Sequence, residues 1–141
     1  MNQQTMTAAE STRQHLEAAL AFAREAGELT LGYFGGSAFE VTTKRDGTKV
    51  TTADRGAEQL LRARIEEAFP EDGILGEEFG EKASVSGWRW VLDPIDGTVS
   101  FVHGVPLYGT LVACEYQGQT PVGVIHMPAL GETVYASAGE G

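Results

Sequence analysis

The chain is poor in the features that mark secreted, membrane-spanning and nucleic-acid-binding proteins. Its single cysteine, Cys114, stands in an apolar run and cannot form a disulfide within the chain, which favours a reducing compartment such as the cytoplasm. No apolar run approaches the roughly 20 residues that a membrane-spanning helix needs. The polar segment 1–10 lacks the basic and apolar regions of a secretory signal, so we interpret it as a flexible leader.

Basic residues are also scarce, because 10 Lys and Arg stand against 20 Asp and Glu, which gives a net charge of −10. Such a surface repels nucleic-acid phosphates and anionic lipids, so we expect neither nucleic acid nor a membrane as a partner. It can still accept an anionic substrate where bound cations reverse the local field. With 42% hydrophobic residues in 141, the chain can form the core of one domain.

Two segments carry apolar residues at helical spacing, one from about Thr7 to Tyr33 and one from about Thr52 to Phe69. Glycines end the first segment, and Pro70 with the following Asp-Gly pair ends the second. Residues 41–50 lie between them and contain an Asp-Gly turn signal, which predicts a hairpin or a mobile loop.

Strands are expected mainly in the second half of the chain. A short apolar run at 73–76 and another at 88–92 predict two strands, with a loop over 79–87 between them and a short helix over 99–102 after them. Apolar runs at 107–116, 121–127 and 133–138 predict a meander of three strands. Helices first and strands last are typical of an α+β fold in which layered helices pack on an antiparallel sheet.

The stretch 90–98 is the strongest candidate for chemistry, because an apolar run ends there in two aspartates three positions apart. Pro94 restricts Asp93 to an extended conformation. The carboxylates of Asp93 and Asp96 can then converge on one point together with the carbonyl of Ile95. Oxygen ligands of this kind suit a hard divalent cation such as Mg²⁺.

The end of the same stretch suits a phosphate. Gly97 lets the backbone approach a ligand without a Cβ in the way, and the N–H groups of Gly97 and Thr98 can hold a phosphate oxygen at the start of the short helix. Taken from spacing alone, an ordinary tight surface turn explains the stretch equally well.

Other acidic residues are weaker candidates. Glu77 and Glu78 follow a strand-like run, where one of them could supply a third metal carboxylate or both could be solvated loop residues. Asp54 begins the second helix, where it could simply complement the helix dipole. Alternatively, Asp54 pairs with the Thr98 hydroxyl, and the two orient and deprotonate an attacking water.

Three motifs in this order resemble the inositol monophosphatase family of Mg²⁺-dependent, lithium-sensitive phosphatases. They are Val50–Asp54, Gly76–Glu78 and Trp90–Thr98, and the resemblance extends from about residue 12 to the last residue. It implies the N-terminal half of the αβαβα sugar-phosphatase fold, with one metal- and phosphate-binding domain over 11–141. Family members are about twice as long, and their second half carries a Trp-Asp motif with a further metal ligand that is missing here. We therefore interpret this chain as an N-terminal half.

The resemblance also implies roles for individual residues. The implied metal ligands are Glu77, Asp93 and Asp96 through their carboxylates and Ile95 through its carbonyl. The implied catalytic residues are Asp54, Thr98 and Glu77. The implied phosphate and substrate contacts are Asp96, Gly97, Thr98 and Lys44, the last in a loop that closes over the site in relatives. Two or three Mg²⁺ ions are expected in a complete enzyme.

A branch of the family is suggested by residues around the third motif. Ser100 stands where the inositol branch commonly has Asn, and the segments 74–80, 96–101 and 104–111 look more like histidinol-phosphate phosphatases. We therefore expect hydrolysis of histidinol phosphate, a step of histidine biosynthesis, with inositol 1-phosphate or a related sugar or nucleotide phosphate as the alternative.

A third possibility is a truncated, inactive metal-binding or assembly module. Relatives are usually homodimers, so the expected partners are a small phosphorylated metabolite and a second copy of the chain.

Overall fold

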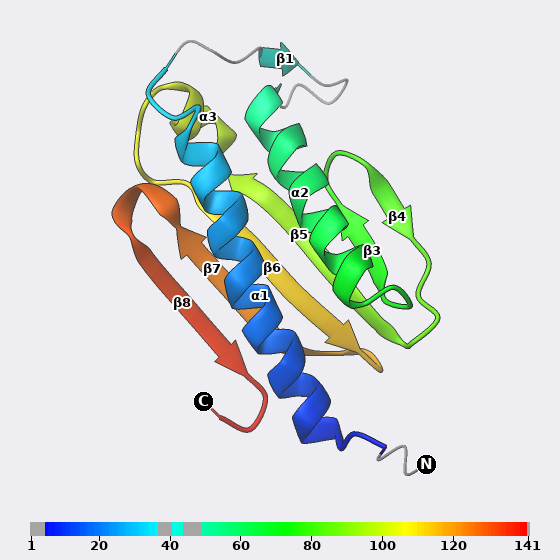
Figure 1. Ribbon diagram of the computed structural model, residues 1–141. Coiled ribbons are helices and arrows are strands. Elements are labelled where there is room, and N and C mark those ends of the chain that lie inside the picture. The colour runs from blue at the N-terminus through cyan, green and yellow to red at the C-terminus, as the bar shows by residue number, and fades with distance from the viewer. Residues whose placement is uncertain (1–4, 37–40, 44–48, 141) are drawn as a thin grey trace.

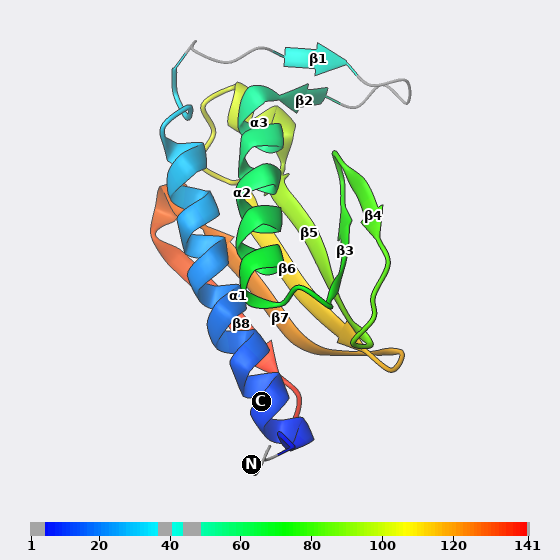
Figure 2. The ribbon, with the colours of Figure 1, turned by 45° about the vertical axis from the view of Figure 1, so that its right-hand side comes forward.

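A computed structural model of the chain describes residues 5–36, 41–43 and 49–140. Two long helices lie side by side on one face of a six-stranded sheet, as Figures 1 and 2 show, and this confirms the expected α+β class. The helices are α1 (Ala8–Leu31), α2 (Thr52–Ala68), the short α3 (Thr98–Val102) and the 3₁₀ turn η1 (Pro128–Leu130). None of the helices described is long and apolar enough to cross a membrane.

The first helix begins earlier than the leader interpretation allows. Thr7 caps α1, because its side chain accepts a hydrogen bond from the Glu10 N–H at 3.1 Å while the Glu10 carboxylate accepts from the Thr7 N–H at 2.9 Å. This reciprocal capping box starts the helix at Ala8. Residues 8–10 of the segment 1–10 are therefore helical, which agrees with the helix predicted from about Thr7.

The strands form two sheets. Among the described residues, β1 (Val41–Thr43) and β2 (Lys49–Thr51) pair with each other in antiparallel fashion, as expected for the predicted hairpin. Residues 44–48 between them lie outside the described residues. The large sheet has the order β4-β3-β5-β6-β7-β8. Its strands are β3 (Gly73–Gly76), β4 (Gly80–Lys82), β5 (Trp88–Asp96), β6 (Gly109–Tyr116), β7 (Gln119–Met127) and β8 (Glu132–Ser137).

The large sheet is mixed, which corrects the expectation of a purely antiparallel one. β3 and β5 run parallel, whereas every other pairing in the sheet is antiparallel. The cause is β4, a three-residue strand within the predicted loop 79–87 that returns the chain to the end where β3 starts. The next strand, β5, therefore runs in the same direction as β3 on its other side.

The core lies between the two long helices and the sheet. Small residues of α1, namely Ala19, Ala23 and Ala26, are fully buried and let the helix approach the sheet closely. They pack in one cluster with inward-facing residues of the strands, including Trp90 and Val112. A second, smaller cluster of Ala53, Ile95, Phe101 and Tyr108 lies beneath α3 and anchors the end of β5.

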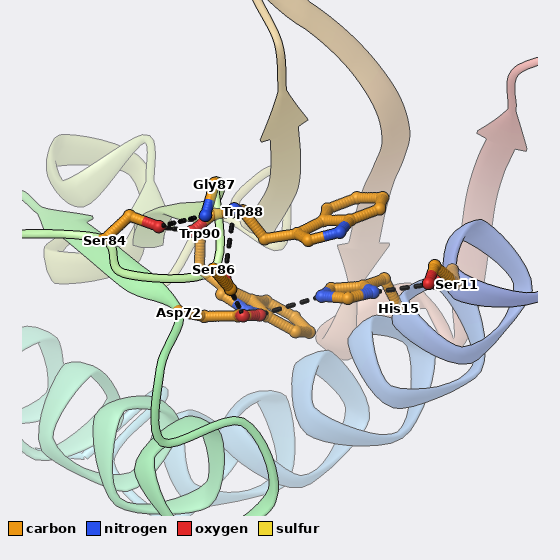
Figure 3. A network of polar contacts seen from close by, with 8 residues as sticks. All are labelled: Ser11, His15, Asp72, Ser84, Ser86, Gly87, Trp88 and Trp90. Carbon is orange, nitrogen blue, oxygen red and sulfur yellow. Dashed lines mark hydrogen bonds and ion pairs between the residues drawn. The ribbon is translucent and has the colours of Figure 1, made fainter. Parts of the chain in front are cut away.

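A buried polar network ties the beginning of β5 to α1 (Figure 3). The Asp72 carboxylate accepts hydrogen bonds from Ser86 Oγ at 2.6 Å and from Trp90 Nε1 at 2.8 Å. His15 Nε2 lies 2.8 Å from Asp72 Oδ2, and its Nδ1 lies 2.7 Å from the Ser11 carbonyl oxygen.

Both ring nitrogens of His15 therefore face acceptors. The ring also stacks on Trp88, with centroids 3.8 Å apart and planes 12° apart. Aromatic packing and hydrogen bonding thus secure this end of the sheet together.

Candidate active site

Asp54 joins the start of α2 to the end of β5. Its Oδ2 accepts a hydrogen bond from the Thr51 backbone N–H at 2.9 Å, which completes the capping box of α2. Its Oδ1 accepts one from the Thr98 hydroxyl at 3.1 Å. Asp54 is only 3% exposed, so both hydrogen bonds are largely shielded from water. The helix-terminal role and the pairing with Thr98, which the sequence left as alternatives, are both present.

The two aspartates of the third motif lie within β5, because the strand extends to Asp96 and not only to the predicted residue 92. Asp93 pairs with Leu111 and Asp96 with Gly109, so β5 has one more residue than β6 between these pairs. This is a β-bulge, where a proline without an N–H is tolerated.

The buried Thr110 ties the bulge down by donating its hydroxyl to the Pro94 carbonyl at 2.9 Å. The irregular strand end is therefore held in place by a specific contact from β6.

Gly97 makes the sharp turn from β5 into α3. Its φ of 89° lies in the left-handed region, and a Cβ there would lie 3.1 Å from the Leu107 carbonyl oxygen. The turn places the Thr98 hydroxyl within reach of two acceptors, Asp54 Oδ1 at 3.1 Å and the Ile95 carbonyl oxygen at 3.2 Å. Thr98 is thus the point where α2, α3 and β5 meet.

The electrostatics of the site are dominated by negative charge. Burial raises the pKa of Asp93 to about 7, and the neighbouring carboxylates act in the same direction. These neighbours are, in decreasing order of effect, Glu77, Asp96, Asp54 and Glu78. The fold therefore gathers the acidic residues of all three sequence motifs around Asp93.

The chemistry of this donor set fits a hard divalent cation, because it consists of carboxylate oxygens and the Ile95 carbonyl. The arrangement of ligands is not yet formed, however. Over the ranges 5–36, 41–43 and 49–140, no three or more His, Cys, Asp or Glu side chains are placed so that they could hold a metal ion as they stand. The carboxylates are neighbours whose oxygens would have to turn towards a common point.

The site borders an apolar groove on the face of the sheet that lies away from α1 and α2. The groove has a volume of about 490 Å³, and Glu77 and Asp93 contribute to its lining. Apolar residues of β5, β6, β7 and β8 line most of the rest, including Leu111, Ile125 and Val134. Ile125 and Val134 are 47% and 67% exposed, so this face carries apolar surface in contact with water. Lys44, the remaining residue expected at the site, lies outside the described residues.

One residue of this region is absent from the sequence-based prediction. Glu58 lies on the buried face of α2, and its carboxylate accepts hydrogen bonds from the backbone that follows Glu77. An acidic residue four positions after Asp54, between the inward-facing Ala57 and Leu61, was the available signal.

Comparison with known proteins shows the family of the chain. The sequence profile of the inositol monophosphatase family matches residues 11–141. The histidinol-phosphatase of Chlorobaculum parvum is 55% identical over 126 residues, which are 89% of this chain and 49% of that protein. The histidinol-phosphatase of Mycobacterium tuberculosis is 45% identical over 123 residues, covering 87% of this chain and 47% of the relative.

A solved structure has the same fold. The extragenic suppressor protein suhB from Bartonella henselae superposes with a TM-score of 0.87 at 32% identity, over 91% of this chain and 50% of that one. The chain belongs to the inositol monophosphatase family, whose enzymes are generally metal-dependent and act on phosphorylated substrates. It spans about half the length of the curated relatives that it matches.

Proposed function

We propose that the chain is the metal- and phosphate-binding half of a Mg²⁺-dependent phosphomonoesterase that converts histidinol phosphate to histidinol. The observation that carries the proposal is the 55% identity over 126 residues with a relative named histidinol-phosphatase. The bonds from the Thr98 hydroxyl to Asp54 and to the Ile95 carbonyl support it, because they join a buried base to a candidate metal-binding turn.

In this proposal Mg²⁺ is held by the carboxylates of Glu77, Asp93 and Asp96 and by the carbonyl of Ile95. Bound Mg²⁺ supplies the positive charge that polarises the phosphoryl oxygens, and two or three ions are proposed for the complete enzyme. The raised pKa of Asp93 is consistent with this role, since a nearby cation favours the charged form of a carboxyl group.

The chain's own residues position the attacking water. As the Thr98 hydroxyl donates its proton to Asp54, its oxygen accepts a proton from the water, which makes the pair a general base. Glu77 would help to orient the same water. The backbone N–H groups of Gly97 and Thr98 would hold a phosphate oxygen. Asp96 and Lys44 are the further substrate contacts that we propose.

We also propose that residues 11–141 act together with a second half, equivalent to the part of the relatives that this chain does not match. Coverage of 49% and 47% of two relatives supports this, and so does the apolar groove beside Glu77 and Asp93, which such a half would cover. Association as a homodimer and a location in the cytoplasm are further proposals, based on the family resemblance.

The experiment is an assay of phosphate release from histidinol phosphate with Mg²⁺, for the wild type and for Asp93→Asn. We expect the variant to lose more than about 100-fold in rate, because even the partners of metal ligands contribute about 10–100-fold. Glu17→Gln, which neutralises an exposed carboxylate on α1, is the matched control. Equal rates for the wild type and Asp93→Asn would remove Asp93 from the mechanism.

Inositol 1-phosphate is the second candidate substrate, because the matching family profile is that of inositol monophosphatases. A large preference for it over histidinol phosphate would overturn the choice of branch. A calorimetric titration with Mg²⁺ belongs in the same series. Weak binding without turnover of either substrate would favour the inactive metal-binding module instead.

A further inference from the structure

Glu58 is a fully buried acid whose contacts are directed at the turn between β3 and β4. Its residue exposure is 0%, and its two carboxylate oxygens accept hydrogen bonds from consecutive backbone N–H groups. These come from Glu78 at 2.8 Å and from Phe79 at 2.9 Å. A buried carboxylate is stable only when it is paired and hydrogen-bonded, so these two bonds are strong determinants of the turn's position.

Arg62, one helical turn further along α2, completes this clamp. Its Nε donates to Glu58 Oε2 at 3.0 Å, and its guanidinium also donates to the carbonyl oxygen of Gly80. The Arg62 side chain is 16% exposed, so it compensates the buried charge of Glu58 from the edge of the core. Two side chains of one helix thus hold the backbone of residues 78–80.

Gly76 shows how closely the turn approaches α2. A Cβ at this position would lie 2.5 Å from Glu58 Oε2, far inside contact distance. The glycine of the Gly76-Glu77-Glu78 motif is therefore required because the Glu58 carboxylate occupies the space of a side chain.

The same face of α2 reaches both sides of the candidate active site. Residues four apart on a helix share a face, so Asp54 and Glu58 point in similar directions. Asp54 contacts Thr98 after β5, and Glu58 contacts the backbone immediately after Glu77.

We propose that Glu58 is a positioning residue that sets the place of the Glu77 carboxylate relative to Asp54 and Asp93. It does so by clamping the turn 77–80 to α2, with Arg62 as its partner. The role towards the metal rests on the proposed function, in which Glu77 is a ligand, whereas the clamp itself does not depend on it.

The main variant is Glu58→Gln, which keeps the size of the side chain but leaves one oxygen to accept two N–H groups. We expect Mg²⁺ affinity to fall roughly 10–100-fold, as is usual when a partner of a metal ligand is changed. We expect the amides of Glu78 and Phe79 to exchange with deuterium faster in the metal-free protein. Glu66→Gln, an exposed glutamate on the same helix, is the matched control and should change neither quantity.

A second variant, Gly76→Ala, keeps every charge and displaces the Glu58 carboxylate by overlap. It should reproduce both effects, and it replaces Glu58→Gln if that variant does not fold. Glu58→Asp, which retains the carboxylate on a shorter side chain, should recover part of the lost affinity.

The experiment combines site-resolved hydrogen exchange of the metal-free chain with calorimetric titration by Mg²⁺. Faster exchange at both amides together with weaker Mg²⁺ binding is the expected result. Faster exchange with wild-type affinity would overturn the positioning role and leave a clamp that serves stability alone. Unchanged exchange would overturn the clamp. A wild type that binds no Mg²⁺ would instead overturn the proposed function and Glu58's role towards the metal, while exchange would still judge the clamp.

Discussion

At the two ends of β5, the surroundings shift the pKa of an acidic side chain in opposite directions. At the beginning of the strand, burial by itself would raise the pKa of Asp72, but hydrogen bonds from His15, Ser86 and Trp90 outweigh burial and lower it. At the far end, burial and neighbouring carboxylates both raise the pKa of Asp93, to about 7. One carboxylate is surrounded by donors, and the other is surrounded by acids.

This difference separates a structural polar network from the acids of the candidate active site. The Asp72 network satisfies its charge with protein groups and therefore contributes to holding α1 on the sheet. The acids around Asp93 repel one another, so their proximity opposes folding of the metal-free chain. Such local conflict is expected where residues are selected for binding a ligand and not for stability.

The largest expected effect is at the structural end. Asp72→Ala should lower the free energy of unfolding by about 3–5 kcal/mol, because it leaves the His15 ring buried without its partner. Urea unfolding followed by tryptophan fluorescence at pH 7 measures this loss. Glu71→Ala, an exposed neighbour, should stay within about 0.5 kcal/mol of the wild type. A loss below about 1 kcal/mol for Asp72→Ala would contradict the contrast.

At the Asp93 end of β5, a substitution is expected to raise the free energy of unfolding and not to lower it. Because the folded pKa of Asp93, about 7, lies above the unfolded value of about 3.9, the folded chain holds the extra proton between these pH values. Stability of the metal-free wild type should therefore fall as pH rises from about 4 to about 7. Asp93→Asn removes this loss and should raise the unfolding free energy by about 1–2 kcal/mol at pH 8 and hardly at all at pH 4.

Unfolding at the two pH values, with Glu17→Gln as control, tests this prediction. Destabilisation by Asp93→Asn at pH 8 would show that the site is not under electrostatic conflict. Addition of Mg²⁺ sharpens the comparison, since a ligand that binds the folded wild type should stabilise it more than the variant.

The smallest expected effect concerns single donors to Asp72. A carboxyl group with a lowered folded pKa contributes stability above its unfolded pKa and loses it as pH falls towards the folded value. Ser86→Ala removes one donor, so it should cost about 1 kcal/mol and move acid unfolding to higher pH. Ser84→Ala is the matched control, because Ser84 bonds to Trp88 and Gly87 and not to Asp72. An equal acid shift in both variants would assign the effect to the loop and not to the carboxylate.

Much of the fold could be predicted because its signals are local. The capping box of Thr51 and Asp54, the helical periodicity of α2 and the apolar run of β5 each depend on residues within one element. β4 could not be predicted in this way, since its glycine and two charged residues become a strand only by pairing with β3. The parallel pairing of β3 with β5 was missed for the same reason, because it follows from the return of the chain through β4.

In the candidate site, too, local features could be predicted and contacts between elements could not. The sequence by itself determined the donor chemistry at the end of β5, because Pro94 and Gly97 restrict the backbone and Asp93 and Asp96 supply the oxygens. Only the tertiary structure decided that the Thr98 hydroxyl donates to Asp54, which lies 44 positions away in the sequence. It also decided that Glu58 accepts a hydrogen bond from the backbone of Glu78, 20 positions away. The pKa of Asp93 was decided there too. Burial and the approach of charges from other elements arise only when α2 packs on the sheet, and no local pattern encodes them.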